Sequence, residues 1–500
     1  MTHDPRSDAN DLSAQVAGVL PQARGLYWNG QWHRSASGAT LTTLNPSTGA
    51  VLAEVDLGGP AEIDAAVAAA RRAFPAWAAT PPLARAAALR EAAQRIRRHA
   101  DELALIDAAD CGNPVKAMRF DAEIAATQLE YFAGLVLEIK GETLPTGNGG
   151  LNYTVREPLG VVGRIYPFNH PFMFAAGKIA APLAAGNTVV IKPPEQAPLS
   201  SIRLLELLHD VFPPGVLNGV VGGREAGAAL AAHPDVAAIG LIGSVPAGLS
   251  VARAAAETLK PALLELGGKN AMVVYPDADF DAAVDGAIRG MNFTWCGQSC
   301  GSTSRLFVHA SLYDRFLEAL VERLPRQHRP GIATHLDTTM GALINRQQYQ
   351  RTLDYIAGAS AEGARLVCGG KHPEAPELAQ GCFIEPTVFA DVTPQMRIAR
   401  EEIFGPVLSV LRWDDEDTMF DAVNGLEFGL TGSIWTENLG TAHRAAQRLQ
   451  SGYLWINECS IHIPGAPFGG YKLSGVGREE SREELLEFTR LKNVHVALRR

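Results

Sequence analysis

The feature that most limits how this chain can fold is an alternation of short apolar segments with helical patterns over residues 161–266. The apolar segments predict strands at Val161–Tyr166, Asn187–Lys192, Val216–Val221, Ala237–Ile242 and Pro261–Leu266. The helical patterns between them cover Phe172–Ala185, Ser200–Val211, Glu225–Ala232 and Ala247–Leu259. Because strands that alternate with helices form parallel sheets covered on both faces, we expect a doubly wound α/β domain. Such sheets bind nucleotides at the carboxyl ends of their strands.

The rest of the chain predicts a second α/β domain and a small arm. Another alternating set runs from Leu306–His309 through Gly429–Thr436 to Tyr453–Asn457. Two isolated strand-like segments, Asn152–Arg156 and Asn493–Leu498, could pair with each other and with another subunit. At 500 residues the chain is too long for one core. We therefore expect an α/β fold of two doubly wound parallel-sheet domains with a β oligomerisation arm, assembled as a homodimer or homotetramer.

The expected domain boundaries follow from these patterns. The polar, patternless N-terminal segment predicts a mobile tail over residues 1–24. The other units are a nucleotide-binding domain of residues 25–140 and 160–268, a second domain of residues 269–456, and oligomerisation strands within residues 141–159 and 480–500.

Charge and cysteine content narrow the class of protein. A net charge of -10 gives no electrostatic reason to bind nucleic acid or an anionic membrane, so we expect a small-molecule substrate. Six irregularly spaced cysteines do not make a disulfide framework in so long a chain. We see neither the basic and apolar start of a signal peptide nor an apolar run long enough for a membrane span. A cytoplasmic protein is the default expectation.

Residues 293–301, Phe-Thr-Trp-Cys-Gly-Gln-Ser-Cys-Gly, contain a candidate nucleophile. The glycine before Gln-Ser-Cys allows a sharp turn that presents Cys300 to a cleft, and thiolates attack carbonyl carbon readily. A buried structural cysteine is the alternative. We expect no metal at Cys296 and Cys300, because no neighbouring pair completes a four-ligand set.

Residues 263–270, Leu-Leu-Glu-Leu-Gly-Gly-Lys-Asn, end a predicted strand and contain a candidate base. A carboxylate at this end of a strand faces the crevice where ligands bind in such folds. Glu265 lies between apolar residues, so partial desolvation should raise its pKa and make it a useful base. The alternative is an exposed glutamate without a role.

Together these two segments resemble the signature motifs of the aldehyde dehydrogenase superfamily, and the resemblance continues in the family's order over about residues 25–498. The further segments are Tyr-Pro-Phe-Asn-His-Pro (166–171), Ile-Lys-Pro-Pro-Glu-Gln-Ala-Pro (191–198), Ile-Gly-Ser-Val-Pro-Ala-Gly (242–248), Glu-Glu-Ile-Phe-Gly-Pro-Val (401–407) and Pro-Phe-Gly-Gly-Tyr-Lys-Leu-Ser-Gly-Val-Gly-Arg-Glu (467–479). The resemblance implies an NAD-dependent enzyme that oxidises an aldehyde to the acid, with the first domain binding NAD and the second carrying catalysis.

In the mechanism that the resemblance implies, the Cys300 thiolate adds to the aldehyde carbon. The Asn169 side-chain amide and the Cys300 backbone N–H stabilise the oxyanion. The thiohemiacetal gives hydride to the nicotinamide, and Glu265 activates the water that hydrolyses the resulting thioester. Lys178 and Glu479 match positions thought to move protons to and from Glu265, although an ordinary helix lysine and a solvated glutamate are the alternative.

The resemblance also implies an NAD site. Lys192 and Glu195 match positions that hold the adenosine ribose hydroxyls. Because the Glu195 carboxylate would repel a 2′-phosphate, NAD is preferred and NADP is possible. The other matched positions are Gly243, Ser244 and Gly248 at the pyrophosphate, where a helix N-terminus offers free N–H groups, and Glu402 and Phe404 at the nicotinamide ribose.

Departures from the family pattern bear on the substrate. Phe168 stands where many relatives have tryptophan, and small Gly177 stands where a bulky aromatic often narrows the substrate tunnel. We expect a roomy apolar pocket suited to aromatic or medium-chain aldehydes. Its expected lining is Phe168, His170, Phe174, Trp295, His462 and Phe468, of which the histidines could add a polar contact.

Three alternatives stay open. An enzyme that resolves the thioester with coenzyme A would usually lack the glutamate that Glu265 matches. A non-catalytic structural relative would not need Cys300, Glu265 and Asn169 to be intact. A cysteine hydrolase would need a histidine beside Cys300, and none occurs at a suggestive position.

Overall fold

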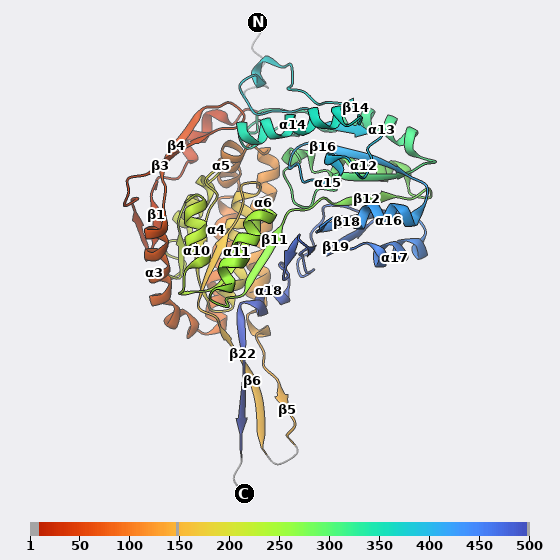
Figure 1. Ribbon diagram of the computed structural model, residues 1–500. Coiled ribbons are helices and arrows are strands. Elements are labelled where there is room, and N and C mark those ends of the chain that lie inside the picture. Colours follow the sequence, from red (N-terminus) through yellow and green to blue (C-terminus); the bar gives the residue numbers. More distant parts are fainter. Residues whose placement is uncertain (1–9, 147–149, 498–500) are drawn as a thin grey trace.

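The computed structural model describes residues 10–146 and 150–497, which form two α/β domains and a protruding β arm (Figure 1). The first domain holds an eight-stranded sheet of order β2-β1-β9-β8-β7-β10-β11-β21. Its strands are β1 (Leu26–Trp28), β2 (Gln31–His33), β7 (Val161–Ile165), β8 (Thr188–Lys192), β9 (Leu217–Gly219), β10 (Val236–Gly243), β11 (Ala262–Leu266) and β21 (Gly475–Val476). The five predicted strands are thus confirmed, and β7 to β11 are parallel to one another, while β1 and β21 pair antiparallel at the two sides of this group.

Helices cover both faces of this sheet. They are α3 (Pro60–Ala78), α4 (Pro82–Arg98), α5 (Ala100–Cys111), α6 (Val115–Gly134), α7 (Pro171–Gly177), α8 (Ala180–Ala184), α9 (Leu199–Leu208), α10 (Arg224–Ala232) and α11 (Val245–Ala256). The single helix predicted over Phe172–Ala185 is wrong, because the chain forms α7 and α8 with a break at Lys178 and Ile179. Pro182 explains the break, since it has no N–H to donate to the Lys178 carbonyl.

The strand order makes one edge of the first sheet a binding position. The chain forms β7, β8 and β9 outward in one direction and then β10 and β11 in the other, so the order reverses between β7 and β10. Ligands bind at the carboxyl ends of strands beside such a reversal. The loops that follow Ile165, Gly243 and Leu266 all leave the sheet at this edge.

The second domain is built on a seven-stranded sheet of order β14-β15-β16-β13-β12-β18-β19. Its strands are β12 (Ala271–Val274), β13 (Arg305–His309), β14 (Arg365–Cys368), β15 (Thr387–Ala390), β16 (Val407–Trp413), β18 (Thr431–Trp435) and β19 (Tyr453–Ile456). The covering helices include α12 (Phe280–Gly290), α13 (Tyr313–Gln327), α14 (Arg346–Ala361), α15 (Arg397–Arg400), α16 (Glu416–Asn424) and α17 (Leu439–Arg448). All pairs but β14–β15 are parallel, so both domains have the expected fold class.

The arm is a three-stranded antiparallel sheet that extends away from both domains (Figure 1). Strand β6 (Leu151–Pro158) lies between β5 (Thr143–Leu144) and β22 (Thr489–Val496). The two isolated strands of the sequence do pair with each other, although Leu498 lies outside the described residues. Short helix α18 (Arg482–Glu487) occupies part of the segment expected to be strand. Pairing with another subunit stays a prediction.

The N-terminal segment does not behave as the predicted mobile tail where it is described. Residues 10–24 include a 3-10 turn at Ser13–Gln15 and helix α2 (Val16–Val19). The side chains of Val16 and Leu20 are buried, and the Leu12 N–H donates to the Thr334 carbonyl at 3.2 Å. The prediction was wrong because these apolar residues recur at helical spacing in a polar background. Residues 1–9 lie outside the described residues.

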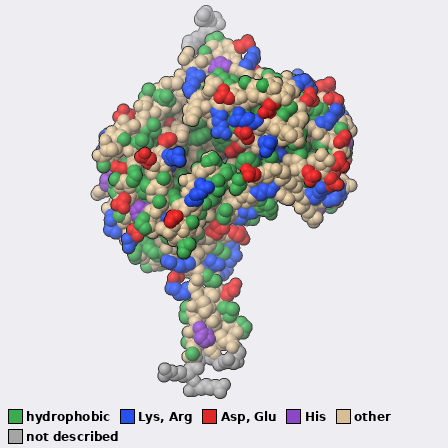
Figure 2. Space-filling model, in the orientation of Figure 1, with side chains coloured by type: hydrophobic (Ala, Val, Ile, Leu, Met, Phe, Trp, Pro, Cys, Tyr) green, Lys and Arg blue, Asp and Glu red, His purple; other side chains and the backbone are tan. Residues whose placement is uncertain are grey.

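Across residues 10–146 and 150–497, no helix is both long enough and apolar enough to cross a bilayer. On the face that Figure 2 shows, acidic and basic side chains are interspersed over both domains, and hydrophobic side chains are visible on the arm.

Candidate active site

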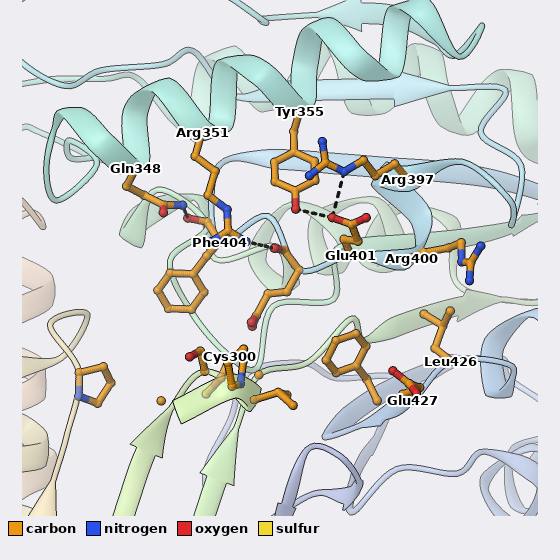
Figure 3. A pocket seen from close by; sticks show the side chains of 18 of the residues that line it. Cys300, Gln348, Arg351, Tyr355, Arg397, Arg400, Glu401, Phe404, Leu426 and Glu427 are labelled. Carbon is orange, nitrogen blue, oxygen red and sulfur yellow. Dashed lines mark hydrogen bonds and ion pairs between the residues drawn. The ribbon is translucent and has the colours of Figure 1, made fainter. Parts of the chain in front are cut away.

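A cleft of about 1060 Å³ opens at the reversal point of the first sheet, against the second domain. The first domain contributes the loop after β7, with Phe168 and Asn169, and the start of α11 at Gly243 and Ser244. The second domain contributes the loop that carries Cys300 and residues around α14 and α15. Figure 3 looks into this cleft, with Cys300 at one end and Phe404, Arg351 and Gln348 above it.

A forced turn presents Cys300. Cys296 and Gly297 have φ of 55° and 67°, in the left-handed region. A Cβ on Gly297 would lie 2.2 Å from the Gly405 carbonyl oxygen, so glycine is required there. The Asn270 side-chain amide holds the backbone of the loop at Cys300 by donating a hydrogen bond to the Cys300 carbonyl oxygen at 2.7 Å. Cys300 remains half-buried, whereas Cys296 is fully buried.

Glu265 lies beside Cys300 at the end of β11, with a 3% exposed fraction. Burial is the main cause that raises the pKa of Glu265 to about 8, the nearby Glu479 charge raises it further, and hydrogen bonding with the Cys300 thiol opposes the rise. Burial, and then the negative charge of Glu265, raise the pKa of the Cys300 thiol well above its usual value. The two groups therefore favour a state in which the thiol keeps its proton and can pass it to an ionised Glu265.

A buried ion-pair network lies behind Glu265. The Lys178 ammonium is 2.9 Å from Glu479 Oε2 and 3.5 Å from Glu480 Oε1. On its other side, the Glu479 carboxylate accepts a hydrogen bond from Arg164 at 2.8 Å. Burial opposes ionisation of Glu479, but the Lys178 and Arg164 cations together hold its pKa below the ordinary value. The structure thus brings the predicted residues Lys178 and Glu479 together. Lys178 is not an unpaired helix lysine, and Glu479 is not a solvated glutamate.

A second cavity, of about 510 Å³, meets the first at Cys300 and Glu265, which line both. It also contains five of the six residues expected in the substrate pocket, namely His170, Phe174, Trp295, His462 and Phe468. Phe168 is the exception, because it lies in the first cleft with its ring edge-on to Phe404 at 5.9 Å. The assignment of Phe168 to the substrate pocket was therefore wrong, because the loop after β7 places it in the first cleft together with Asn169.

Sequence reasoning missed the helix that forms one wall of the second cavity. Phe120, Ile124, Gln128 and Tyr131 of α6 lie on one face and line the cavity. Their helical spacing was a usable signal, because the opposite face of α6 carries the buried residues. Gly177 does not add free space as expected, since a Cβ there would lie 1.9 Å from Gln128 Oε1. The Gln128 side chain fills that position.

The predicted cofactor residues divide into two groups. Gly243, Ser244, Glu402 and Phe404 line the first cleft, and Ser244 caps α11 by accepting a hydrogen bond from Ala247 N–H at 3.4 Å. The Gly268 N–H donates to Glu402 Oε1 at 3.1 Å, while burial raises the pKa of Glu402 to about 7.

Lys192 is the last residue of β8 and Glu195 lies in the loop that follows, and neither lines the cleft. The Lys192 ammonium donates to the Gly222 carbonyl at 2.5 Å, and burial lowers its pKa to about 8. A Cβ on Gly223 would lie 2.4 Å from Glu195 Oε2. Gly248 has a different role from the one expected, because a Cβ there would lie 2.4 Å from Leu266 Cδ1. It lets α11 pack closely on β11 and does not line the cleft.

The chain matches the family model described as "Aldehyde dehydrogenase family" over residues 32–494. The chain belongs to the aldehyde dehydrogenase family. Among curated relatives, it is 49% identical to the aldehyde dehydrogenase tropH of Talaromyces stipitatus, over 96% of this chain and 94% of that protein. It is 42% identical to a betaine aldehyde dehydrogenase of Cereibacter sphaeroides, over 92% of this chain and 95% of that protein.

Solved structures of aldehyde dehydrogenases agree with the fold. The NAD+ complex of aldehyde dehydrogenase from Bacillus cereus matches with a TM-score of 0.92 and 38% identity, covering 100% of both chains. The P. syringae indole-3-acetaldehyde dehydrogenase AldA, in a complex with NAD+ and IAA, matches with a TM-score of 0.94 and 37% identity, covering 97% of this chain and 99% of that chain. The protein is accordingly an NAD-dependent aldehyde oxidoreductase.

The residues of the first cleft fit NAD. Helix α11 directs its N-terminus, with its positive dipole end, at the cleft beside Ser244, which suits a pyrophosphate. Nothing lies within 3.7 Å of a Cβ built on Gly243, so a ligand can approach its backbone. The half-buried Glu402 carboxylate offers an acceptor for ribose hydroxyls.

Proposed function

We propose that this aldehyde dehydrogenase converts an aldehyde to the carboxylic acid through a thioester on Cys300, with Glu265 as the base for hydrolysis. One observation carries the proposal: Cys300 and Glu265 both line the junction at which the cofactor cleft meets an aromatic-lined cavity. An aldehyde in the second cavity would thus meet the nucleophile, the base and the cofactor cleft at a single point.

The first step is addition to the carbonyl. Ionised Glu265 takes the thiol proton, and the Cys300 sulfur forms a bond with the aldehyde carbon while the carbonyl electron pair moves to oxygen. Asn169 lines the cleft beside Cys300, and the Asn113 amide holds its backbone carbonyl at 2.8 Å. The Asn169 side-chain amide and the Cys300 N–H are the donors for the oxyanion. A preorganised donor of this kind contributes about 3 kcal/mol.

Loss of hydride then gives the thioester. NAD, when bound, accepts the hydride that leaves the aldehyde carbon. Glu265 first gives up the proton that it took from the thiol and is ionised again. It then removes a proton from water, the resulting hydroxide adds to the thioester carbon, and the Cys300 thiolate departs as the acid forms. The Lys178–Glu479 pair lies close enough to Glu265 to affect its pKa, so it is the proposed route by which that proton leaves.

The aldehyde oxidation test compares two cysteines. Cys300→Ala should lower NADH formation by about a thousandfold or more while NAD binding by calorimetry changes little. Cys368→Ala is the matched control, because Cys368 is also half-buried but lines neither cavity. A Cys300→Ala enzyme that keeps most of its turnover would refute the nucleophile. Parallel assays with added coenzyme A decide between water and coenzyme A as the group that releases the acyl product.

A further inference from the structure

The second cavity has a largely aromatic wall, and one polar pair lies among its rings. The aromatic part consists of Phe120, Tyr131, Phe132, Phe174, Trp455 and Phe468. Among these rings, His170 Nδ1 lies 2.7 Å from Asp121 Oδ2. The Asp121 side chain has an exposed fraction of 1% and that of His170 13%, so the pair is withdrawn from bulk water. A polar pair in such a position is costly unless its hydrogen-bonding groups are used.

The pair fixes which ring nitrogen of His170 is free. An ionised Asp121 carboxylate has no proton to donate, so Oδ2 accepts a hydrogen bond from His170 Nδ1–H. The other ring nitrogen, Nε2, takes no part in this pair. Neighbouring rings hold the imidazole in place, with Phe174 edge-on at 5.6 Å and Trp295 tilted at 5.4 Å. No described residue donates to or accepts from Nε2. This nitrogen is therefore available to a molecule in the cavity.

Three of the carboxylates that line the cavity already have a lysine or arginine beside them. Glu123 pairs with Arg97 at 2.8 Å, Glu479 with Arg164 at 2.8 Å, and Glu480 with Lys178 at 3.5 Å. Glu265, with a pKa of about 8, is mostly protonated at neutral pH. An aromatic wall can attract a quaternary ammonium group, and Asp121 is paired with a histidine and not with a lysine or arginine, so a cationic aldehyde is the competing occupant that the experiment has to exclude.

We propose that His170, oriented by Asp121, binds a hydroxyl group on an aromatic aldehyde. This inference rests on the proposed function, because it assigns the substrate class of the same site. The aromatic wall takes the ring, and the hydroxyl meets Nε2. A phenolic hydroxyl suits both states of the imidazole, since it donates to the Nε2 lone pair and, when ionised, accepts from Nε2–H. His170 is the residue that selects the substrate, and Asp121 is a positioning residue.

The test measures kcat/KM for meta- and para-hydroxybenzaldehyde and for benzaldehyde, and takes the ratio of the better hydroxylated substrate to benzaldehyde. We expect a ratio of about ten or more in the natural enzyme, because a site built to hydrogen-bond a hydroxyl rejects the analogue that lacks it. The His170→Phe variant should lower this ratio about tenfold, and Asp121→Asn should lower it less. Comparing the ratio between variants cancels the effect of the hydroxyl on carbonyl reactivity.

The matched control is His335→Phe. His335 also pairs with an aspartate, with Nε2 3.3 Å from Asp11 Oδ1, but it lines neither cavity. This variant should keep the ratio unchanged. A natural enzyme that does not prefer the hydroxylated aldehyde, that prefers betaine aldehyde, or whose preference survives His170→Phe would overturn the proposal.

A binding measurement separates this inference from the proposed mechanism. In the Cys300→Ala background with NAD present, para-hydroxybenzaldehyde should bind about tenfold more tightly than benzaldehyde, and His170→Phe should remove the difference. If the difference is present but Cys300→Ala still oxidises aldehydes, the nucleophile is wrong and the hydroxyl site stands. If Cys300→Ala is inactive and the two aldehydes bind equally, the nucleophile stands and the hydroxyl site is wrong.

Discussion

At the scale of single residues, burial opposes ionisation of both members of the Cys300–Glu265 pair. Each pKa lies above its ordinary value, and the first cause in each case is loss of solvent. A thiol in this state is a poor nucleophile until a base takes its proton. Glu265 lines both cavities beside Cys300, so the same carboxyl is suited to starting the reaction and to activating water at the end.

This environment predicts a particular pH dependence. Glu265 acts as a base only when ionised, and its pKa is raised to about 8. Below that pH, kcat should fall about tenfold per unit, and above it kcat should level off. The measurement is steady-state NADH formation from about pH 6 to about pH 9 at saturating NAD. A rate that stays constant over this range would exclude Glu265 as the essential base.

The turn before Cys300 predicts a large effect of one methyl group. In Gly297→Ala, the new Cβ would meet the Gly405 oxygen at 2.2 Å in a backbone with φ of 67°. Backbone strain and this close contact together should lower the free energy of unfolding by about 3 kcal/mol. They should also displace Cys300, so both the melting temperature and kcat should fall.

Gly38→Ala is the control for that variant. Gly38 has φ of 71° but nothing within 4 Å of its Cβ position, so only the backbone penalty of about 1 kcal/mol applies. Its kcat should stay normal. Equal melting temperatures for the two variants would show that the Gly405 contact is not rigid.

At the scale of secondary-structure elements, the Arg164–Glu479–Lys178 network joins strand β7 to the segment that follows β21. The Arg164 and Glu479 side chains are 2% and 3% exposed. Removing one partner of a buried ion pair leaves the other charge uncompensated. Arg164→Leu should therefore lower the stability by about 3 kcal/mol or more, which thermal unfolding would measure.

The control for this prediction is an exposed ion pair. Arg71 lies 2.8 Å from Asp235 with side chains that are 68% and 37% exposed. Solvent screens such pairs, so Arg71→Leu should change stability by less than about 0.5 kcal/mol. If both variants lose the same stability, the buried network does not hold the two elements together.

Elements differ in how well the sequence predicts them, and burial is the reason. Strands β7 to β11 are continuous apolar runs because both faces of the sheet are covered, and the predicted ranges agree within two residues at most ends. Strand β16 was missed, although its residues are nearly all buried. The prediction of one continuous helix through Lys178 was wrong because it did not take into account that Pro182 interrupts helical hydrogen bonding.

The candidate site was predictable in its residue types but less so in its orientations. Motifs identified Cys300 and Glu265, since glycines at fixed spacing carry that information along the chain. The side on which Phe168 lies and the close approach of Gly248 to Leu266 depend on how two elements pack, which a single motif does not encode. The same holds for Asp121, which reaches His170 from another helix.

At the scale of the whole molecule, the arm exposes apolar side chains that would remain in contact with water in a monomer. Leu151 and Val496 lie opposite each other in β6 and β22 and have exposed fractions of 42% and 36%. Exposed apolar pairs on an extended sheet favour association with a further sheet. We expect a homo-oligomer formed through this arm.

Charged substitutions test that expectation. Leu151→Asp combined with Val496→Asp should shift the sedimentation coefficient to that of the monomer, because burying two carboxylates in the contact is costly. Leu439→Asp is the control, since Leu439 is 72% exposed on α17 in the second domain. Identical sedimentation of the double variant and the natural chain would place the contact elsewhere.

Intact mass spectrometry of Glu265→Gln tests most directly whether a covalent intermediate forms at the junction of the two cavities. After mixing with an aldehyde and NAD, this variant should form about one NADH per subunit rapidly and then nearly stop. Thioester hydrolysis has lost its base, so its rate should fall by about a hundredfold or more. Its mass should increase by one acyl group, and peptide mapping should locate that group on Cys300. An unmodified protein, or an acyl group on another residue, would contradict the account.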